Sequence, residues 1–441
     1  MGALLERFFG LAARGTTVRT EIVAGLTTFL AMAYIVVVNP AILGEGGVPI
    51  AGAAAATCLI AGLASILMGL YANLPLAMAP GMGLNAYFAF TVVKGLGVPW
   101  QTAMGCVFLS GVVFLVLTFT GVRRLIVGAI PRPLLAAIPA GIGLFIAFIG
   151  LRDAGIVVGD PSTTVALGKL AAPAPIIALL GVILIGALQA WRIKGAVLIG
   201  VVVSAIAGIL LGLSHPPPTT FSLAALGSTA FKLDIPGALN LKGNLGLTLL
   251  EVVFVFLFVD LFDNVGTLVG VASKAGLVEP DGSIRNVDRI LVTDSVATIA
   301  GALAGTSTVT SYIESTAGVA AGGRTGLTAV VTGLLFLAAL LVSPLVQAIP
   351  TAAAAPALIL VGSMMLSGLG EVDWADPVEA IPAFLTLLLI PLTFSIANGL
   401  AFGVVSYAAL KLVSGRARKD DWLLYGLAVL FVARFAYMAA A

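Results

Sequence analysis

The chain reads APGMGLNAY at residues 79–87 and GTSTVTSYIES at residues 305–315, and each stretch interrupts an apolar run. Clusters of Gly, Pro, Ser and Thr favour extended backbone, which survives at membrane depth only where it lines a cavity inside the protein. A half-helix would then begin in mid-membrane, with its free N–H groups and positive dipole end directed at a ligand. A packing seam of small residues is the alternative, but a polar residue follows each break, Asn85 and Glu314. The sequence therefore predicts two broken spans beside a binding site.

The rest of the chain is too apolar for a water-soluble fold. Hydrophobic residues occupy 60% of the 441 positions and charged residues only 10%, whereas a soluble domain carries about 25% charged residues. At about 20 residues for each crossing, we predict an all-α membrane protein with fourteen transmembrane segments. The predicted spans are 21–43, 51–71, 76–93, 101–120, 133–150, 174–190, 195–212, 246–272, 288–304, 308–321, 325–342, 351–367, 378–395 and 397–413. The apolar stretch 422–440 contains Arg434, and we expect it to lie at the membrane interface.

The composition also restricts the partners of the chain. A net charge of +2 provides no basic face for nucleic acid. The two cysteines, Cys58 and Cys106, lie inside apolar runs, and the one histidine, His215, lies in a polar stretch. These residues form neither a disulfide framework nor a zinc-binding spacing. We therefore expect a lipid bilayer around the protein, and neither a metal nor a cofactor in it.

Basic residues in short loops predict the orientation of the chain. They precede the first span, separate spans four and five and spans six and seven, and follow span fourteen. These residues are Arg7, Arg14, Arg19, Arg123, Arg124, Arg132, Arg192, Lys194, Arg416, Arg418 and Lys419. All fall on one side if the chain crosses fourteen times. We expect a multi-pass protein of the plasma membrane with a cytoplasmic N-terminus.

The two halves of the chain resemble each other. Ala-Ile-Pro opens span five at residues 129–131 and span twelve at residues 348–350. We predict a first repeat over residues 15–212, a polar connecting loop over 213–245, a second repeat over 246–415 and an apolar tail over 416–441. Because seven is an odd number, the second repeat must be inverted relative to the first. Inverted repeats are typical of secondary transporters, whose binding site lies near the membrane midplane between the repeats.

Three carboxylates fall inside predicted spans. Asp260 and Asp263 are three residues apart in span eight, so they share a helix face, and Glu314 follows the break in span ten. A carboxylate inside a span is costly and is usually functional. No Lys or Arg is expected at the same depth, and burial of this kind favours the protonated form of a carboxyl group. Asp260, Asp263 and Glu314 are therefore candidate proton carriers.

The other polar and aromatic residues of these spans suggest a ligand class. Asn85 offers a hydrogen-bond donor and an acceptor in one plane, and flat faces could come from Phe29, Tyr87, Phe88 and Tyr312. Together with the carboxylates, these groups suit a planar, uncharged, hydrogen-bonding ligand that travels with a proton. A nucleobase fits this description, whereas carboxylates would repel an inorganic anion.

The two broken stretches and the run Asp260-Leu261-Phe262-Asp263 resemble the AzgA-like purine permeases, a branch of the nucleobase/ascorbate transporter superfamily. The resemblance extends from about residue 15 to about residue 415. It implies a seven-plus-seven inverted repeat, a core domain of spans one to four and eight to eleven, and a gate domain of spans five to seven and twelve to fourteen, which often forms a homodimer. It also implies import of adenine, guanine or hypoxanthine by alternating access. From the carboxylates in the spans we expect coupling to a proton rather than to sodium.

The resemblance also assigns residues. It implies that Asn85, Asp260 and Glu314 bind the purine and that Asp263 is a further essential acid. The run Tyr312-Ile313-Glu314 resembles the Tyr-Gly-Glu run of related uracil permeases, in which backbone groups beside the glutamate contact the base. Those permeases have a histidine after the acid of span eight, where this chain has Thr267. Proton handling is therefore expected to depend on carboxylates.

Two other function classes remain open at this point. A carrier of the same fold could transport another solute, such as a pyrimidine or an anion of the sulfate or bicarbonate type, although an anion would require a cationic pocket. The run Asp260-Leu261-Phe262-Asp263-Asn264 also resembles the aspartate-rich magnesium motif of intramembrane prenyltransferases. Those enzymes need a second aspartate cluster with Lys or Arg for the pyrophosphate, and the spans contain no such cluster. We therefore predict a transporter and not an enzyme.

Overall fold

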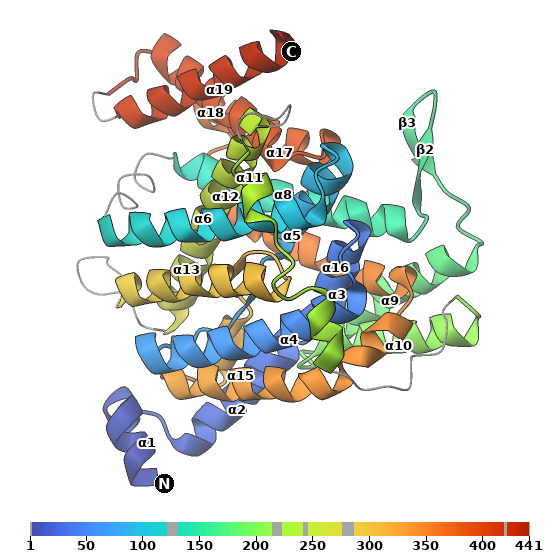
Figure 1. The fold of residues 1–441 in the computed structure, drawn as a ribbon, viewed down its shortest axis with the longest axis vertical. Helices are drawn as coiled ribbons and strands as arrows, with labels where there is room; N and C mark the ends of the chain where they lie inside the picture. Colours follow the sequence, from blue (N-terminus) through green and yellow to red (C-terminus); the bar gives the residue numbers. More distant parts are fainter. Residues whose placement is uncertain are drawn as a thin grey trace. The chain divides into compact units, whose positions relative to one another are not determined.

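The computed structural model describes residues 2–120, 131–213, 223–240, 246–275, 286–418 and 421–440, and this part of the chain is mostly helical (Figure 1). The α-helices are α1 (Gly2–Phe9), α2 (Val18–Met32), α3 (Ile35–Glu45), α4 (Ile50–Leu67), α5 (Met82–Ala86), α6 (Trp100–Thr120), α8 (Arg132–Asp153), α9 (Pro173–Ala190), α10 (Ala196–Leu210), α11 (Ile235–Ala238), α12 (Gly246–Ala275), α13 (Val287–Ala304), α14 (Ser315–Ala320), α15 (Gly326–Ala339), α16 (Thr351–Met364), α17 (Pro377–Leu392), α18 (Ile396–Val413) and α19 (Trp422–Ala440). The strands are β1 (Met78–Pro80), β2 (Val157–Asp160), β3 (Thr164–Leu167) and β4 (Val309–Ser311).

The lengths of the helices agree with a membrane protein. In the described part of the chain, eight helices are long and apolar enough to cross a bilayer, and Ala196–Leu210, Pro377–Leu392 and Trp422–Ala436 are shorter apolar helices. The count of fourteen spans and the inverted repeat stay predictions, as does the interfacial position of residues 422–440. Several residues used above lie outside the described part of the chain: Arg123, Arg124, Ala129, Ile130, His215 and Lys419.

Extended backbone is confirmed at both predicted breaks. Predicted span 76–93 begins with β1 and continues through α5 into a π-helix, Tyr87–Gly95. Predicted span 308–321 begins with β4 and continues as α14. Pro80 lacks the N–H that a helix interior would need, and Gly305 ends α13 with a φ of 94°, which favours glycine. Local sequence therefore interrupts the helix in both places.

The contacts divide the chain into two compact units. One contains Met1–Thr118 and Gly150–Ala357, and the other contains Phe119–Ile149 and Leu358–Ala441. Each unit takes residues from both halves of the sequence. All the predicted site residues belong to the first unit. The division into core and gate domains stays a prediction.

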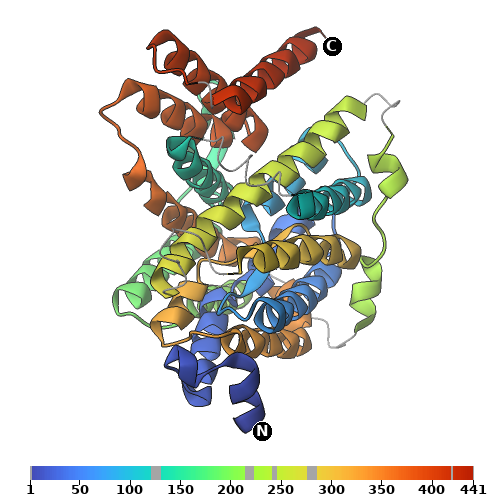
Figure 2. The same cartoon turned by 90° about the vertical axis from the view of Figure 1, so that its left-hand side faces the viewer.

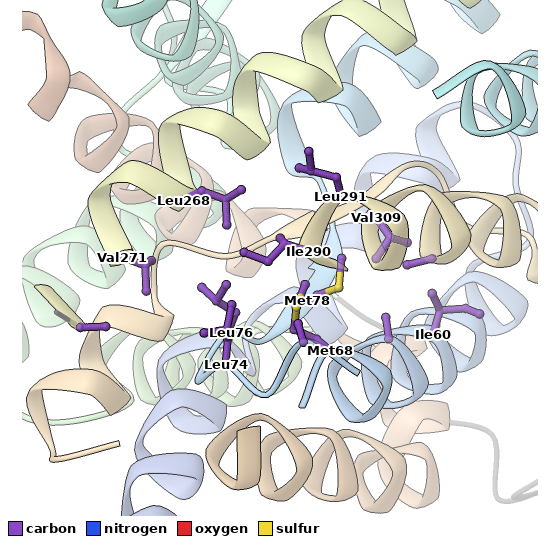
Figure 3. Close-up of a cluster of buried hydrophobic side chains, with 14 of the residues drawn as sticks. Ile60, Met68, Leu74, Leu76, Met78, Leu268, Val271, Ile290, Leu291 and Val309 are labelled. Carbon is purple, nitrogen blue, oxygen red and sulfur yellow. The ribbon is translucent and has the colours of Figure 1, made fainter. Parts of the chain in front are cut away.

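A cluster of buried apolar side chains surrounds the two breaks in the first unit (Figure 3). Met78 of β1 and Val309 of β4 lie in it together with Ile60 of α4, Leu268 of α12 and Ile290 of α13. These elements are far apart in the sequence, and each contributes apolar area that is removed from water or lipid contact. The strands are thus enclosed by packed helices, as extended backbone inside a membrane protein requires.

Glycines bring α4 and α15 into backbone contact. The two helices run side by side in Figure 1 and in the rotated view of Figure 2. A Cβ atom at Gly326 would lie 1.9 Å from the carbonyl oxygen of Gly69, and one at Gly333 would lie 2.5 Å from that of Gly62. The two glycines of each segment are seven residues apart, so they lie on one face. Small residues at such a seam let helix backbones approach closely in a membrane.

The first turn of α15 is capped by a side chain from α2. Glu21 is fully buried and accepts hydrogen bonds from the N–H groups of Arg324 (2.8 Å), Thr325 (3.3 Å) and Thr328 (3.1 Å). The hydroxyl of Thr328 also donates to Glu21 over 2.6 Å. A carboxylate here satisfies N–H groups that have no partner within the helix and complements the helix dipole. The contact ties α2, which leads into the candidate site, to α15.

The second unit contains the start of α8, the end of α16, and α17, α18 and α19. Gly143 and Gly362 let α8 and α16 approach closely, because a Cβ atom at Gly143 would lie 2.6 Å from the carbonyl oxygen of Gly362. Phe394 packs its ring against Phe145 and Phe148 with centroid distances of 5.4 and 5.6 Å. Arg434 of α19 donates to the side-chain oxygen of Asn398 over 3.1 Å.

Candidate functional site

The two broken segments pair with each other. β1 and β4 form an antiparallel ribbon in the register Met78 with Ser311, Ala79 with Thr310 and Pro80 with Val309. The ribbon is extended at both ends, where Gly81 N–H donates to Thr308 O over 2.9 Å and Tyr312 N–H donates to Ala77 O over 3.0 Å. This pairing brings the stretch that leads to Asn85 beside the stretch that leads to Glu314.

Neighbouring hydroxyl groups satisfy the outer backbone groups of the ribbon. Met78 N–H donates to Ser65 Oγ over 2.9 Å, and Ala77 N–H donates to Ser315 Oγ over 3.0 Å. Because a lone two-stranded ribbon leaves half its backbone groups without strand partners, these serines replace the missing strands. The ribbon is therefore a fixed element on which site residues can be positioned.

Glu314 lies three residues after the end of β4, beside Tyr34, the residue that precedes α3. The hydroxyl of Tyr34 donates to Glu314 Oε1 over 2.5 Å. The carboxylates of Glu314 and Asp263 are near enough for their charges to interact. Asp263 Oδ2 in turn lies 3.8 Å from the position that a Cβ atom would take at Gly81. Two of the three predicted carboxylates thus lie next to the paired breaks.

Asp260 reaches the same ribbon through α13. The hydroxyl of Thr298 lies 3.4 Å from Asp260 Oδ2 and 3.1 Å from the carbonyl oxygen of Val309 in β4. The N–H of Val309 also donates to this hydroxyl over 3.1 Å. The structure therefore gathers Asp260, Asp263 and Glu314 around one ribbon.

Asn85 lies in α5, on the other side of the break from β1. It is fully buried, and its amino group donates to the side-chain oxygen of Asn39 in α3. Its own carbonyl oxygen, Oδ1, has no hydrogen-bond partner among the described residues. A buried acceptor without a partner costs free energy, so this atom is one that a ligand could satisfy.

The predicted aromatic residues take different places. Tyr312 donates its hydroxyl to the carbonyl oxygen of Pro80, so it holds the ribbon. Phe88 is fully buried, and Phe29 packs edge-to-face on Phe336 with a centroid distance of 5.1 Å. Ile313 is 43% exposed, between the buried Tyr312 and the half-buried Glu314. Contact of Phe29, Phe88, Tyr312 and Ile313 with a ligand stays a prediction.

The structure adds polar residues that the sequence patterns did not single out. Tyr34 directly precedes α3 and Asn39 lies within it, both in an apolar run, and Asn264 follows Asp263 in α12. A polar side chain inside an apolar span is usually functional, so Asn39 and Asn264 carry the same kind of signal in the sequence as the carboxylates do.

Several of these buried groups still lack partners. Among the described residues, the following side-chain atoms on or beside the ribbon have none: Asn85 Oδ1, Asn264 Nδ2 and Oδ1, Thr308 Oγ1, Thr310 Oγ1 and Ser311 Oγ. Native proteins contain few such groups, and each calls for a water, an ion or a ligand. The described residues contain no group of three or more His, Cys, Asp or Glu that could hold a metal ion. The arrangement suits an organic ligand with several hydrogen-bonding edges.

Comparison with known proteins places the chain among transporters. Residues 19–402 match the model of a permease family (Xan_ur_permease). Over 99% of its length the chain is 47% identical to the putative permease MJ0326 of Methanocaldococcus jannaschii, with 99% of that protein covered. It is 44% identical to the adenine permease AdeP of Escherichia coli, with 99% and 97% of the two chains covered. It is 43% identical to the guanine/hypoxanthine permease PbuG of Bacillus subtilis, with 98% and 100% covered.

A solved structure shows the same fold. The chain resembles the transmembrane domain of the cyanobacterial bicarbonate transporter BicA with a TM-score of 0.65, and 87% of this chain and 97% of that domain are covered. The sequences are only 16% identical, so the likeness concerns the fold and not the solute.

Proposed function

The chain belongs to this permease family, and we propose from that premise that it is a secondary active transporter that imports purine nucleobases. Relatives that are named adenine permease or guanine/hypoxanthine permease match it over nearly their whole length. The observation that carries the proposal is the set of buried hydrogen-bonding atoms without partners around the β1–β4 ribbon, beside three carboxylates. The relatives are permeases rather than enzymes, which rules out the prenyltransferase alternative.

The proposed purine site has one wall from each break. Asn85, which follows the first break, offers an acceptor. Glu314, which follows the second break, accepts N–H groups of the base. Asp260 and the backbone beside Tyr312 and Ile313 would complete the hydrogen bonds. Phe29 and Phe88 would supply apolar surface. A purine matches this set because its edges carry several donors and acceptors in one plane.

The proposed coupling ion is a proton, carried on Asp263 with contributions from Asp260 and Glu314. A carboxylate that moves between the two sides of a membrane should be neutralised first, because a charge inside a span is costly. Asp263 and Glu314 interact, and two neighbouring carboxylates disfavour the state in which both are ionised. Protonation of one would therefore accompany closure of the site during alternating access.

The same fold also occurs in a bicarbonate transporter, so an anion is the alternative solute. The electrostatics of this site disfavour it. Asp260, Asp263 and Glu314 surround the ribbon, and their negative charge would repel bicarbonate or sulfate. A neutral base meets no such penalty.

The arrangement in the membrane is part of the proposal. The relatives and the apolar helices imply a multi-pass membrane protein. We infer a plasma-membrane location, a cytoplasmic N-terminus, fourteen spans in a core and a gate domain, and a homodimer formed through the gate domain. The basic loop residues and the family resemblance support these inferences.

Uptake into proteoliposomes tests the function. We expect the purified protein to take up labelled adenine, guanine or hypoxanthine in a saturable manner, and faster when a pH gradient directs protons inward. A sodium gradient at constant pH should have no such effect. Saturable uptake of bicarbonate or uracil without uptake of any purine would contradict the proposal.

Glu314→Gln should weaken purine binding about ten- to hundredfold. Tyr34 would keep the amide oxygen as its acceptor, so the new amino group would face an N–H of the base. A mispaired buried polar group costs about 1–3 kcal/mol, which corresponds to this loss of affinity. Competition binding with labelled purine measures it.

Glu45→Gln is the matched control for this substitution. Glu45 forms an ion pair with Lys94, and both side chains are partly exposed, so the pair contributes little. The control variant should bind purines as the wild-type protein does. Wild-type affinity in Glu314→Gln would remove Glu314 from the site.

A further inference from the structure

We propose that Thr57 and Asn39 fix the side-chain amide of Asn85 in one orientation, so that Asn85 recognises a hydrogen-bond donor on the substrate and cannot accept the opposite pattern. This inference rests on the proposed purine site. It assigns a positioning role to Asn39 of α3 and Thr57 of α4. Neither residue is adjacent in the sequence to a break. An amide that could turn freely would suit either pattern on a base.

Thr57 in α4 uses its only hydroxyl hydrogen within its own helix. Its hydroxyl donates to the carbonyl oxygen of Ala53, one turn earlier in the same helix, over 2.6 Å. A hydroxyl has a single hydrogen, so only a lone pair is left to face Asn39. The atom of Asn39 that lies 2.7 Å from this hydroxyl must therefore be a donor, which makes it the amide nitrogen Nδ2.

The second hydrogen of the same amide nitrogen is also used. Asn39 Nδ2 lies 3.0 Å from the hydroxyl oxygen of Thr306, in the segment that leads into β4. Thr306 alone would not set the orientation, because its hydroxyl could donate to an oxygen as readily as it accepts from a nitrogen. Thr57 sets it, because its hydrogen is already committed to Ala53.

The orientation of Asn39 then determines that of Asn85. With its nitrogen turned to the two threonines, Asn39 presents its oxygen to Asn85, and only the amino group of Asn85 can donate to it. The oxygen of Asn85 is left, and it has no partner among the described residues. Asn39, Thr57, Asn85 and Thr306 are all fully buried, so a misdirected partner would leave a buried polar group unsatisfied, which costs free energy.

Thr57→Val is the decisive variant, because it removes the hydroxyl and keeps the shape. Asn39 could then turn its oxygen to the hydroxyl of Thr306, and Asn85 could turn its amino group to the substrate. Adenine, hypoxanthine, guanine and xanthine differ in whether ring positions 1, 2, 3 and 6 carry a hydrogen-bond donor or an acceptor. We expect the ratio of competition constants for at least one pair of these bases to change at least fivefold.

Three further variants distinguish a changed orientation of the Asn85 amide from a loss of binding that affects all four bases equally. Thr57→Ser keeps the hydroxyl and should keep the wild-type ratios. Thr306→Val leaves Thr57 in place, so affinity should fall for all four bases while their ratios stay the same. Thr293→Val removes a buried hydroxyl that donates to Arg289 O over 2.8 Å, the same one-turn bond as that of Thr57. It should change neither the affinities for the four bases nor their ratios.

The outcomes distinguish the orientation from the function. If Thr57→Val keeps the wild-type ratios while Asn85→Ala changes them, the orientation proposal is wrong and purine transport stands. If Thr57→Ser changes the ratios as much as Thr57→Val, the hydroxyl is not the cause, and the proposal is again wrong. Absence of saturable binding of all four bases to the wild-type protein would refute the purine function and the orientation proposal together.

Discussion

Asp263→Asn is expected to abolish purine accumulation driven by a pH gradient, while purine exchange at equal pH is partly retained. Asp263 lies beside Gly81 at the end of the ribbon, and its charge interacts with that of Glu314. An asparagine keeps the shape of the side chain and cannot bind and release a proton. The transporter would then still bind its substrate and change conformation, and it would no longer use the gradient.

Two measurements on the same proteoliposomes check this expectation: gradient-driven uptake and counterflow of labelled purine. Asp260→Asn should impair both, because Asp260 is proposed to contact the substrate. Asp160→Asn, in the exposed β2–β3 hairpin where Asp160 accepts N–H groups of Ser162 and Thr163, should impair neither. Loss of counterflow in Asp263→Asn alone would reverse the two roles. Gradient-driven uptake equal to wild type in both site variants would refute proton transport by these residues.

Gly326→Ala is expected to destabilise the first unit strongly. The added methyl group would lie 1.9 Å from the carbonyl oxygen of Gly69 and 2.9 Å from the Cα atom of Asn73. These are backbone atoms, so neither can move aside as a flexible side chain would. Over-packing of a buried seam costs about 1–3 kcal/mol and occasionally more, and we expect about 3 kcal/mol here.

The loss should appear as a lower thermal unfolding temperature of the purified protein and a smaller folded fraction in detergent. Gly186→Ala is the matched control, because Gly186 lies in α9 and a Cβ atom there would meet nothing within 4 Å. Alanine favours helix over glycine by about 1 kcal/mol, so the control variant should be as stable as the wild-type protein or slightly more so. Equal unfolding temperatures for the two variants would contradict the backbone contact between α4 and α15.

Local chemistry made the breaks and the candidate site residues recognisable in the sequence. The interruptions within residues 79–87 and 305–315, where β1 and β4 are extended, follow from Pro, Gly, Ser and Thr, whose preferences depend on their immediate neighbours. Asp260, Asp263 and Glu314 stood out because a carboxylate inside an apolar span costs free energy, whichever helices that span packs against. The sequence by itself thus determined a helical membrane protein, the two interruptions, and three acids and an amide around them.

The partner of each group was decided by the tertiary structure. Pairing of β1 with β4 joins residues more than 200 positions apart, and no local pattern selects that register. The same holds for Tyr34, which donates to Glu314, and for the hydrogen bonds that connect Thr57, Asn39 and Asn85. Glu21 looks like an ordinary residue at the start of a span, and only the fold shows that it caps α15.

The physical reason is that burial and hydrogen bonding depend on which atoms meet, and not only on residue type. A buried donor or acceptor must find a partner or lose free energy, and that partner can come from any part of the chain. The sequence could show that Asn85 carries both a donor and an acceptor. Which of the two remains free depends on the single hydrogen of Thr57, which is bound to Ala53 within α4. The packing of α3 against α4 then brings Asn39 to the remaining lone pair of that hydroxyl.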